Sequence, residues 1–235
     1  MTALQTFLAL LFVPLWAVGQ NNPGGTSQAK SNNEHVVFQK LHLQQLLQGK
    51  MYDYKYPAVK GHQYWGETIY NEGSVTFEGV TYQDILLNYD IYNNLLATFI
   101  VQDGLSKLII LDNSRITNFE INHHMFVNIT DSTHTLNPGY YLSAYQGTDI
   151  QLLVKTQKTI VGNTGLPGEL LRKFFQEDTH ILVVKGRQHI IKNKKDVIQA
   201  FGDYPELILF IQNERLRFKK NHQMTISLQT VLERL

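Results

Sequence analysis

Apolar and polar residues alternate with the period of a β-strand along the middle of the chain. Val75 and Phe77 alternate with polar neighbours, and the segment 85–92 repeats the pattern. Such alternation gives a strand one apolar and one largely polar face. Turn residues then separate a further series of apolar segments at 95–101, 107–111, 116–121, 125–129, 140–145 and 149–156. Short strands at this spacing predict an antiparallel meander, either a sandwich or a curled, partly closed barrel.

The pattern changes after residue 161. A glycine-rich break spans 162–168, and 169–177 has the periodicity of a helix. A hairpin around Gly186 is expected over 181–192. Helix-start residues then predict helices over about 194–202 and 205–213, with a last one over 224–235. The fold class predicted is therefore α+β, mainly β, with a helical C-terminal segment.

The N-terminal residues resemble a processing signal. Residues 3–18 are almost wholly apolar and end in Ala17-Val18-Gly19, although no basic residue precedes them. This predicts a secretory signal peptide over 1–19, cleaved near Gly19; an uncleaved anchor or a buried helix is the alternative. A flexible linker over 20–34, a domain over 35–161 that starts with a short amphipathic helix (36–49), and a C-terminal segment over 162–235 are expected to follow.

Composition narrows the function classes. The chain has 235 residues, no cysteine and a formal net charge of +1. Lack of cysteine excludes disulfides, thiolate metal sites and thiol catalysis, and beside a signal peptide it favours a bacterial envelope, periplasmic or outer-envelope associated. The near-neutral balance argues against nucleic-acid binding. No later segment is apolar over the length of a membrane-spanning helix, so none is expected after cleavage.

The small net charge is the sum of an acidic and a basic half of the chain. Residues 1–154 carry 7 basic and 12 acidic side chains, a net −5, whereas residues 155–235 carry 14 basic and 8 acidic ones, a net +6. The basic clusters predict contact with an envelope protein or an anionic surface. The two halves docking on each other, or a simply solvated helix face, are the alternatives. The candidate partner-binding residues are Lys194, Lys195, Arg215, Arg217, Lys219 and Lys220.

Motifs that carry chemistry are largely missing. Nucleophile elbows, phosphate loops and zinc-protease helices are absent, so no catalytic residue, metal or cofactor is predicted. His123 and His124 are adjacent on an expected strand turn, which favours surface histidines over metal ligands. The aromatic set around Trp65 either packs in the core or binds a ligand. The candidate ligand-binding residues are Tyr64, Trp65, Tyr89, Asp90 and Tyr92.

Several spaced motifs resemble one family. They are Gly73-x-Val75-x-Phe77-x-Gly79-x-x-Tyr82, Leu87-x-Tyr89-Asp90-Ile91-Tyr92-x-x-Leu95, Tyr140-Tyr141-Leu142-x-x-Tyr145-x-Gly147 and Lys194-Lys195-x-Val197-x-x-Ala200-Phe201. Together they are similar to an uncharacterised family of exported, β-rich proteins of Bacteroidota. The resemblance implies an extracytoplasmic location and a β-domain with a helical C-terminus, and it assigns no site residue.

Three functions follow as hypotheses. The first is a non-catalytic binding or interaction protein of the cell envelope. The second is a carrier that holds a lipid or other apolar ligand in a curled sheet. The third is an envelope hydrolase using strand carboxylates, for which Asp84 and Asp90 would have to face each other across a cleft. Oligomeric state is left open.

Overall fold

The computed structural model describes residues 45–235 except 68–69, 103, 132–135, 165–169 and 220. The expected signal peptide and linker, and most of the helix expected over 36–49, lie outside these residues. The strands are β1 (Val59–Lys60), β2 (Asn71–Phe77), β3 (Val80–Asp90), β4 (Leu95–Gln102), β5 (Leu105–Ile110), β6 (Ile116–Ile121), β7 (His124–Ile129), β8 (Gly139–Gln146), β9 (Ile150–Thr164), β10 (Leu170–Val184) and β11 (Arg187–Ile191). The helices are the 3-10 turn η1 (Asn113–Arg115), α2 (Lys194–Ala200), α3 (Pro205–Asn213) and α4 (Asn221–Leu232).

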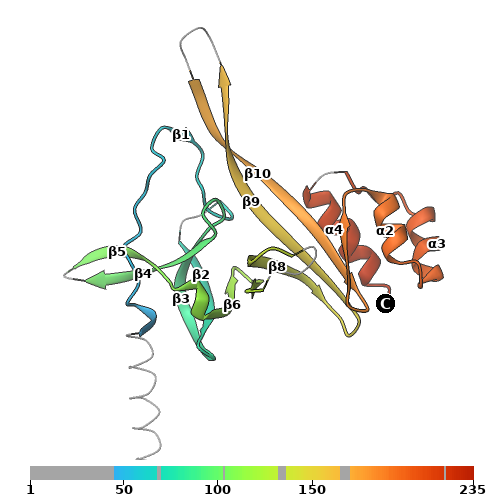
Figure 1. The fold of residues 1–235 in the computed structure, drawn as a ribbon, viewed down its shortest axis with the longest axis horizontal. Coiled ribbons are helices and arrows are strands. Elements are labelled where there is room, and N and C mark those ends of the chain that lie inside the picture. The colour runs from blue at the N-terminus through green and yellow to red at the C-terminus, as the bar shows by residue number, and fades with distance from the viewer. Residues whose placement is uncertain (1–44, 68–69, 103, 132–135, 165–169, 220) are drawn as a thin grey trace, which may run out of the picture. The chain divides into compact units, whose positions relative to one another are not determined.

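All eleven strands belong to one sheet that does not close on itself. Their order is β1-β10-β9-β8-β7-β6-β2-β3-β4-β5, with β11 also beside β10. Every pairing is antiparallel except that of β1 with β10. After β5 the chain returns through η1, so that β6 pairs with β2 (Figure 1). The predicted mainly-β fold with a helical C-terminal segment is confirmed.

The helix predicted over 169–177 is wrong, because residues 170–177 lie in β10; residue 169 lies outside the described residues. Cross-strand partners run from Leu170 opposite Thr164 to Val184 opposite Ile150. Paired apolar and paired polar residues at 170–177 imitate a helical period, but local propensity is a weak preference that a long ladder of backbone hydrogen bonds overrides. The domain boundary predicted between 161 and 162 consequently lies inside β9.

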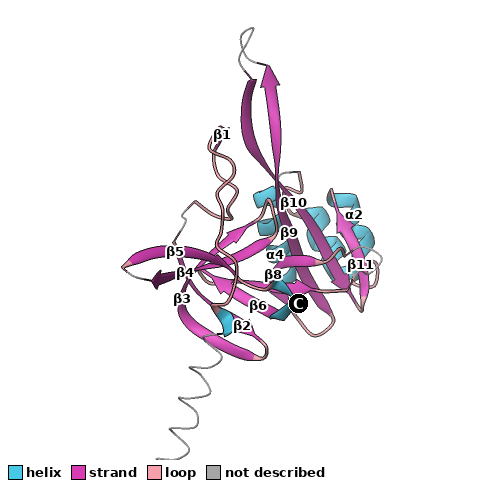
Figure 2. Cartoon of the chain, turned by 60° about the vertical axis from the view of Figure 1, so that its left-hand side comes forward, coloured by secondary structure: helices cyan, strands magenta, loops and turns pink. Residues whose placement is uncertain are grey.

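The three C-terminal helices pack beside β8–β11 and share one apolar core with them (Figure 2). Phe201, Leu207 and Leu228 are buried there against the strands' Leu152 and Leu182. The N-terminal signal of α2 acts as the sequence indicates, whereas α3 has Pro205 in its first turn but no side-chain cap. Asn193 caps α2 by accepting from the backbone N–H of Lys195 and Asp196, and the Asp196 carboxylate accepts from the Asn193 N–H in return.

The meander from β2 to β8 has a separate, aromatic core. Tyr89, Phe119, Phe126 and Tyr140 are almost fully buried, and their ring centroids lie 4.8–5.5 Å apart. Most of these pairs meet edge to face, the geometry that the ring quadrupole favours. Side chains therefore fill the interior at this end of the sheet.

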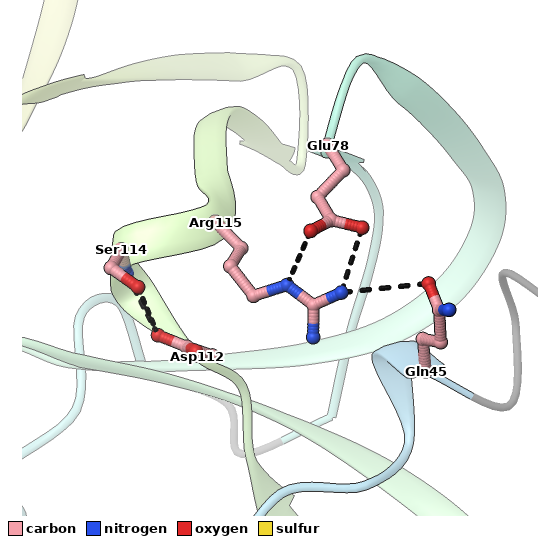
Figure 3. Close-up of polar contacts among 5 residues, drawn as sticks. All are labelled: Gln45, Glu78, Asp112, Ser114 and Arg115. Atoms are coloured by element: carbon pink, nitrogen blue, oxygen red, sulfur yellow. Dashed lines mark hydrogen bonds and ion pairs between the residues drawn. The ribbon is translucent and has the colours of Figure 1, made fainter.

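An ion pair clamps the β2–β3 turn to η1 (Figure 3). Arg115 donates from Nε to Glu78 Oε1 at 2.7 Å, its Nη2 lies 2.7 Å from Oε2, and its guanidinium stacks 4.4 Å from the centre of the Phe77 ring. Glu78 adopts a left-handed φ of 49° in this turn. The paired contact fits a planar guanidinium against a carboxylate and fixes where β6 begins.

Candidate functional site

Asp90, a predicted ligand residue, lies fully buried at the end of β3. Its Oδ1 accepts from the backbone N–H of Tyr92 at 3.0 Å and of Asn93 at 2.9 Å. Its Oδ2 accepts from the Tyr52 hydroxyl at 2.5 Å and from Asn93 Nδ2 at 2.7 Å. Burial, together with the hydrogen bond given to Asp90, raises the pKa of Tyr52. Both carboxylate oxygens therefore hold the β3–β4 turn.

The other predicted ligand residues lie in different surroundings. Tyr89 is buried in the aromatic core, and Tyr64 is buried beside Asp90, with which it forms a β-bridge. Tyr92 packs edge to face on Tyr56 and Phe174. Trp65 contacts Phe126 and lines a cavity beside α4. The five residues are thus neighbours in the fold that do not converge on one open site.

Asp84 and Asp90 do not form a facing pair of carboxylates. They are six residues apart on the same strand, which corresponds to about 20 Å at 3.3 Å per residue. Asp84 is exposed and left-handed with φ of 54°, while Asp90 is buried in its turn. The spacing that glycoside hydrolysis needs is therefore not met by this pair.

The predicted surface position of His123 and His124 agrees with the structure, in which both are exposed. His123 Nδ1 lies 3.6 Å from Glu120 Oε1. Among the residues that the structure describes, no group of three or more His, Asp or Glu side chains is arranged to hold a metal ion.

The two basic clusters meet at a single groove, which we call the basic-rimmed groove. It is lined by Asn193, Lys194, Lys195, Leu216, Arg217, Phe218, Lys219 and Gln223 and encloses about 550 Å³. Lys194 and Lys195 open the first turn of α2, and residues 216–219 belong to the segment between α3 and α4. Arg215 is exposed on that segment outside the lining, and Lys220 lies outside the described residues.

One serine fixes the segment that carries the second cluster. Ser227, buried on α4, accepts from the backbone N–H of Arg217 at 3.1 Å and donates to the Arg217 carbonyl at 3.0 Å. Phe218 is buried in the helical core, while Leu216 is half-buried. The backbone is therefore anchored, and Arg217 and Lys219 are held exposed on either side of the buried ring.

The chemistry of this groove is apolar at its floor and cationic at its rim. In the described part of the chain, Lys194, Lys195, Arg217 and Lys219 form no ion pair. Long basic side chains lay their aliphatic stems along apolar surface and keep the charge in water. Sequence reasoning found the cations but missed Leu216, Phe218 and Gln223; the alternation of basic and apolar residues over 215–219 was the available signal.

Comparisons with known proteins add no relative: no family model, no curated protein and no solved structure matches this chain. None of the described helices has the length and apolarity to cross a membrane.

Proposed function

We propose that the chain is a non-catalytic binding protein of the cell envelope, exported by its N-terminal signal, whose basic-rimmed groove binds an acidic segment with apolar side chains on a partner envelope protein. The observation that carries this proposal is the set of four cations around an apolar floor that form no ion pair with any residue the structure describes. Carboxylates of the partner would pair with the rim, and its apolar side chains would cover Leu216.

The groove favours a peptide segment over a flat anionic surface. Half-buried Gln223 lies among the lining residues and offers an amide donor and acceptor for a partner's backbone. The apolar floor rewards side chains that enter it, whereas a surface of charged head groups would contact the rim alone. Rim charges act mainly by raising the association rate, and salt screens them.

A defined peptide tests the proposal. The probe is a fluorescein-labelled twelve-residue peptide with glutamate and leucine residues among glycine and serine, titrated with the full chain while fluorescence polarisation is followed. We expect saturable binding that Lys194→Glu with Lys195→Glu weakens by at least about tenfold, equivalent to about 1.4 kcal/mol. Replacing the peptide's leucines by serine should weaken binding as well.

The matched control reverses another adjacent basic pair. Arg172 and Lys173 are exposed on β10, away from the groove lining, so Arg172→Glu with Lys173→Glu should leave the affinity unchanged. Equal losses of peptide affinity in the two double variants would mean that net charge alone governs the interaction, and would contradict binding at the groove. Tighter binding to vesicles of phosphatidylglycerol than to the peptide would contradict a protein partner and indicate an anionic membrane instead.

A further inference from the structure

A second cavity lies between α4 and the strands β7–β10. It encloses about 500 Å³, within the range of roughly 300–1000 Å³ typical of small-molecule sites. Its lining shares no residue with the basic-rimmed groove. Nothing in the proposed function uses it.

Trp65 forms the aromatic wall of this cavity and is held rigidly. Its indole packs edge to face on Phe126, with centroids 5.2 Å apart, and against the His124 ring at 5.0 Å. Its backbone N–H donates to the Tyr89 carbonyl at 2.8 Å. Trp65 is half-buried and keeps part of its surface in the cavity. A ring fixed in advance binds a ligand without the entropy cost of ordering it.

The rest of the lining combines apolar with polar side chains. Ser143, Thr156, Gln176, Asp178 and His222 supply hydroxyl, amide, carboxylate and imidazole groups, and neither lysine nor arginine occurs among the lining residues. Thr156 is only 5 % exposed yet lines the cavity. Gln176 Nε2 and Asp178 Oδ1 lie 3.4 Å apart and present a joined donor and acceptor surface.

We infer that this cavity binds a neutral mono- or disaccharide. A sugar ring has an apolar C–H face that packs on an indole and hydroxyls that both donate and accept hydrogen bonds. The lining offers an aromatic wall for the apolar face of the sugar, and hydrogen-bond donors and acceptors for its hydroxyls. An anionic ligand would meet the Asp178 carboxylate with no lysine or arginine in the lining to balance it, in contrast to the basic-rimmed groove.

Tryptophan fluorescence gives a direct test. In full-length Trp16→Phe protein, Trp65 is the only tryptophan. Titration with cellobiose, maltose and N,N′-diacetylchitobiose should give a saturable emission change with at least one of them, at a Kd of about 1 mM or below. Gln176→Ala should weaken that binding at least about fivefold, or about 1 kcal/mol. Gln157→Ala changes an exposed glutamine on the neighbouring strand, outside the cavity, and should have no effect.

Several results would overturn the inference. No saturable change with any of the three disaccharides up to about 20 mM, equal effects of the two glutamine variants, or tighter binding of glucose 6-phosphate than of glucose would each exclude a neutral saccharide at this place. Lys194→Glu with Lys195→Glu should leave the saccharide titration unchanged, so the two proposals fail separately.

Discussion

The meander and the helical end of this protein both carry polar side chains beside apolar ones, but they use them differently. In the meander, the Asp90 carboxylate and the hydroxyls of Tyr89 and Tyr140 are enclosed and bonded to partners within the chain. At the helical end, the cations around the basic-rimmed groove extend into solvent and form no ion pair within the described residues. Polar groups that are hydrogen-bonded within the chain stabilise the fold. Charged groups that have no ion-pair partner among the described residues remain available to bind another molecule.

The strongest test of this comparison is at Asp90. The two oxygens of Asp90 accept from four donors. Asp90→Asn replaces one of these oxygens by an NH₂ group, so the buried donors that face it lose their acceptor. We expect the free energy of unfolding to fall by about 2–3 kcal/mol. Asp84→Asn, on the same strand but exposed and equally compatible with a left-handed backbone, should change it by less than about 0.5 kcal/mol. Urea denaturation of both variants measures the difference; equal effects would show that Asp90 does not anchor its turn.

Lys155, on β9, contacts Tyr141 of the meander and gives the protein a stability that depends on pH. Its ammonium lies 4.5 Å over the Tyr141 ring and 3.5 Å from the Pro138 carbonyl, and burial lowers its pKa to about 8. In the unfolded chain the pKa of Lys155 has its ordinary value near 10.5. Above pH 8 the unfolded chain therefore binds more protons than the folded protein, so the free energy of unfolding rises with pH. Between pH 7 and 9 Lys155 should contribute about 1 kcal/mol to the gain, and Lys155→Met should reduce the gain by that amount. Burial also lowers the pKa of Lys158, and the variant leaves that contribution in place.

The control for this pH effect is Lys173→Met, which removes an exposed lysine of the neighbouring strand β10. It should preserve the rise in stability. Measurements stop at pH 9, because buried Tyr89 and Tyr140, whose pKa values are raised by burial, oppose the rise once the unfolded chain's tyrosines ionise. A flat profile in the unmodified protein would contradict a neutralised Lys155.

A tyrosine pair compares the two regions directly. The Tyr89 hydroxyl donates to Asn94 Oδ1 at 3.0 Å inside the meander, whereas the Tyr204 hydroxyl has no hydrogen-bond partner among the described residues. Tyr89→Phe should lower the free energy of unfolding by about 1 kcal/mol, and Tyr204→Phe by less than about 0.5 kcal/mol. Thermal unfolding of both variants checks this; a larger loss for Tyr204→Phe would reverse the comparison.

The smallest stability effect is expected at the groove itself. Lys194→Gln with Lys195→Gln removes two solvated charges while keeping long side chains, so stability should change by less than about 0.5 kcal/mol. The same double variant should weaken binding of the acidic peptide. Loss of stability without loss of binding would mean that these lysines serve the fold.

Much of the fold could be predicted because alternation is a local property. The strands from β2 to β8 were visible in the sequence, as were the Asn193 cap of α2 and Pro205 at the start of α3. The end of β10 belongs to the hairpin predicted around Gly186, but its first half was missed because residues 170–177 carry a helix-like period, and only pairing with β9 decides their conformation.

The candidate sites were predictable in part. The basic residues of 194–195 and 217–219 could be named, but their convergence depends on how α2 packs beside α4, which no local pattern encodes. Asp90 was singled out as a ligand residue, although the backbone N–H groups two and three residues ahead, with Asn93, are typical of an aspartate that anchors its own turn.

Amide chemical shifts show whether the acidic peptide binds at the basic-rimmed groove. The acidic, leucine-containing peptide is titrated into ¹⁵N-labelled full-length protein while the resonances of the groove and of the β3–β4 turn are followed. We expect perturbations centred on residues 193–195, 216–219 and 223, with the turn after Asp90 unchanged. Perturbations centred on the Asp90 turn or on the β9–β10 hairpin, with the groove resonances unmoved, would contradict it.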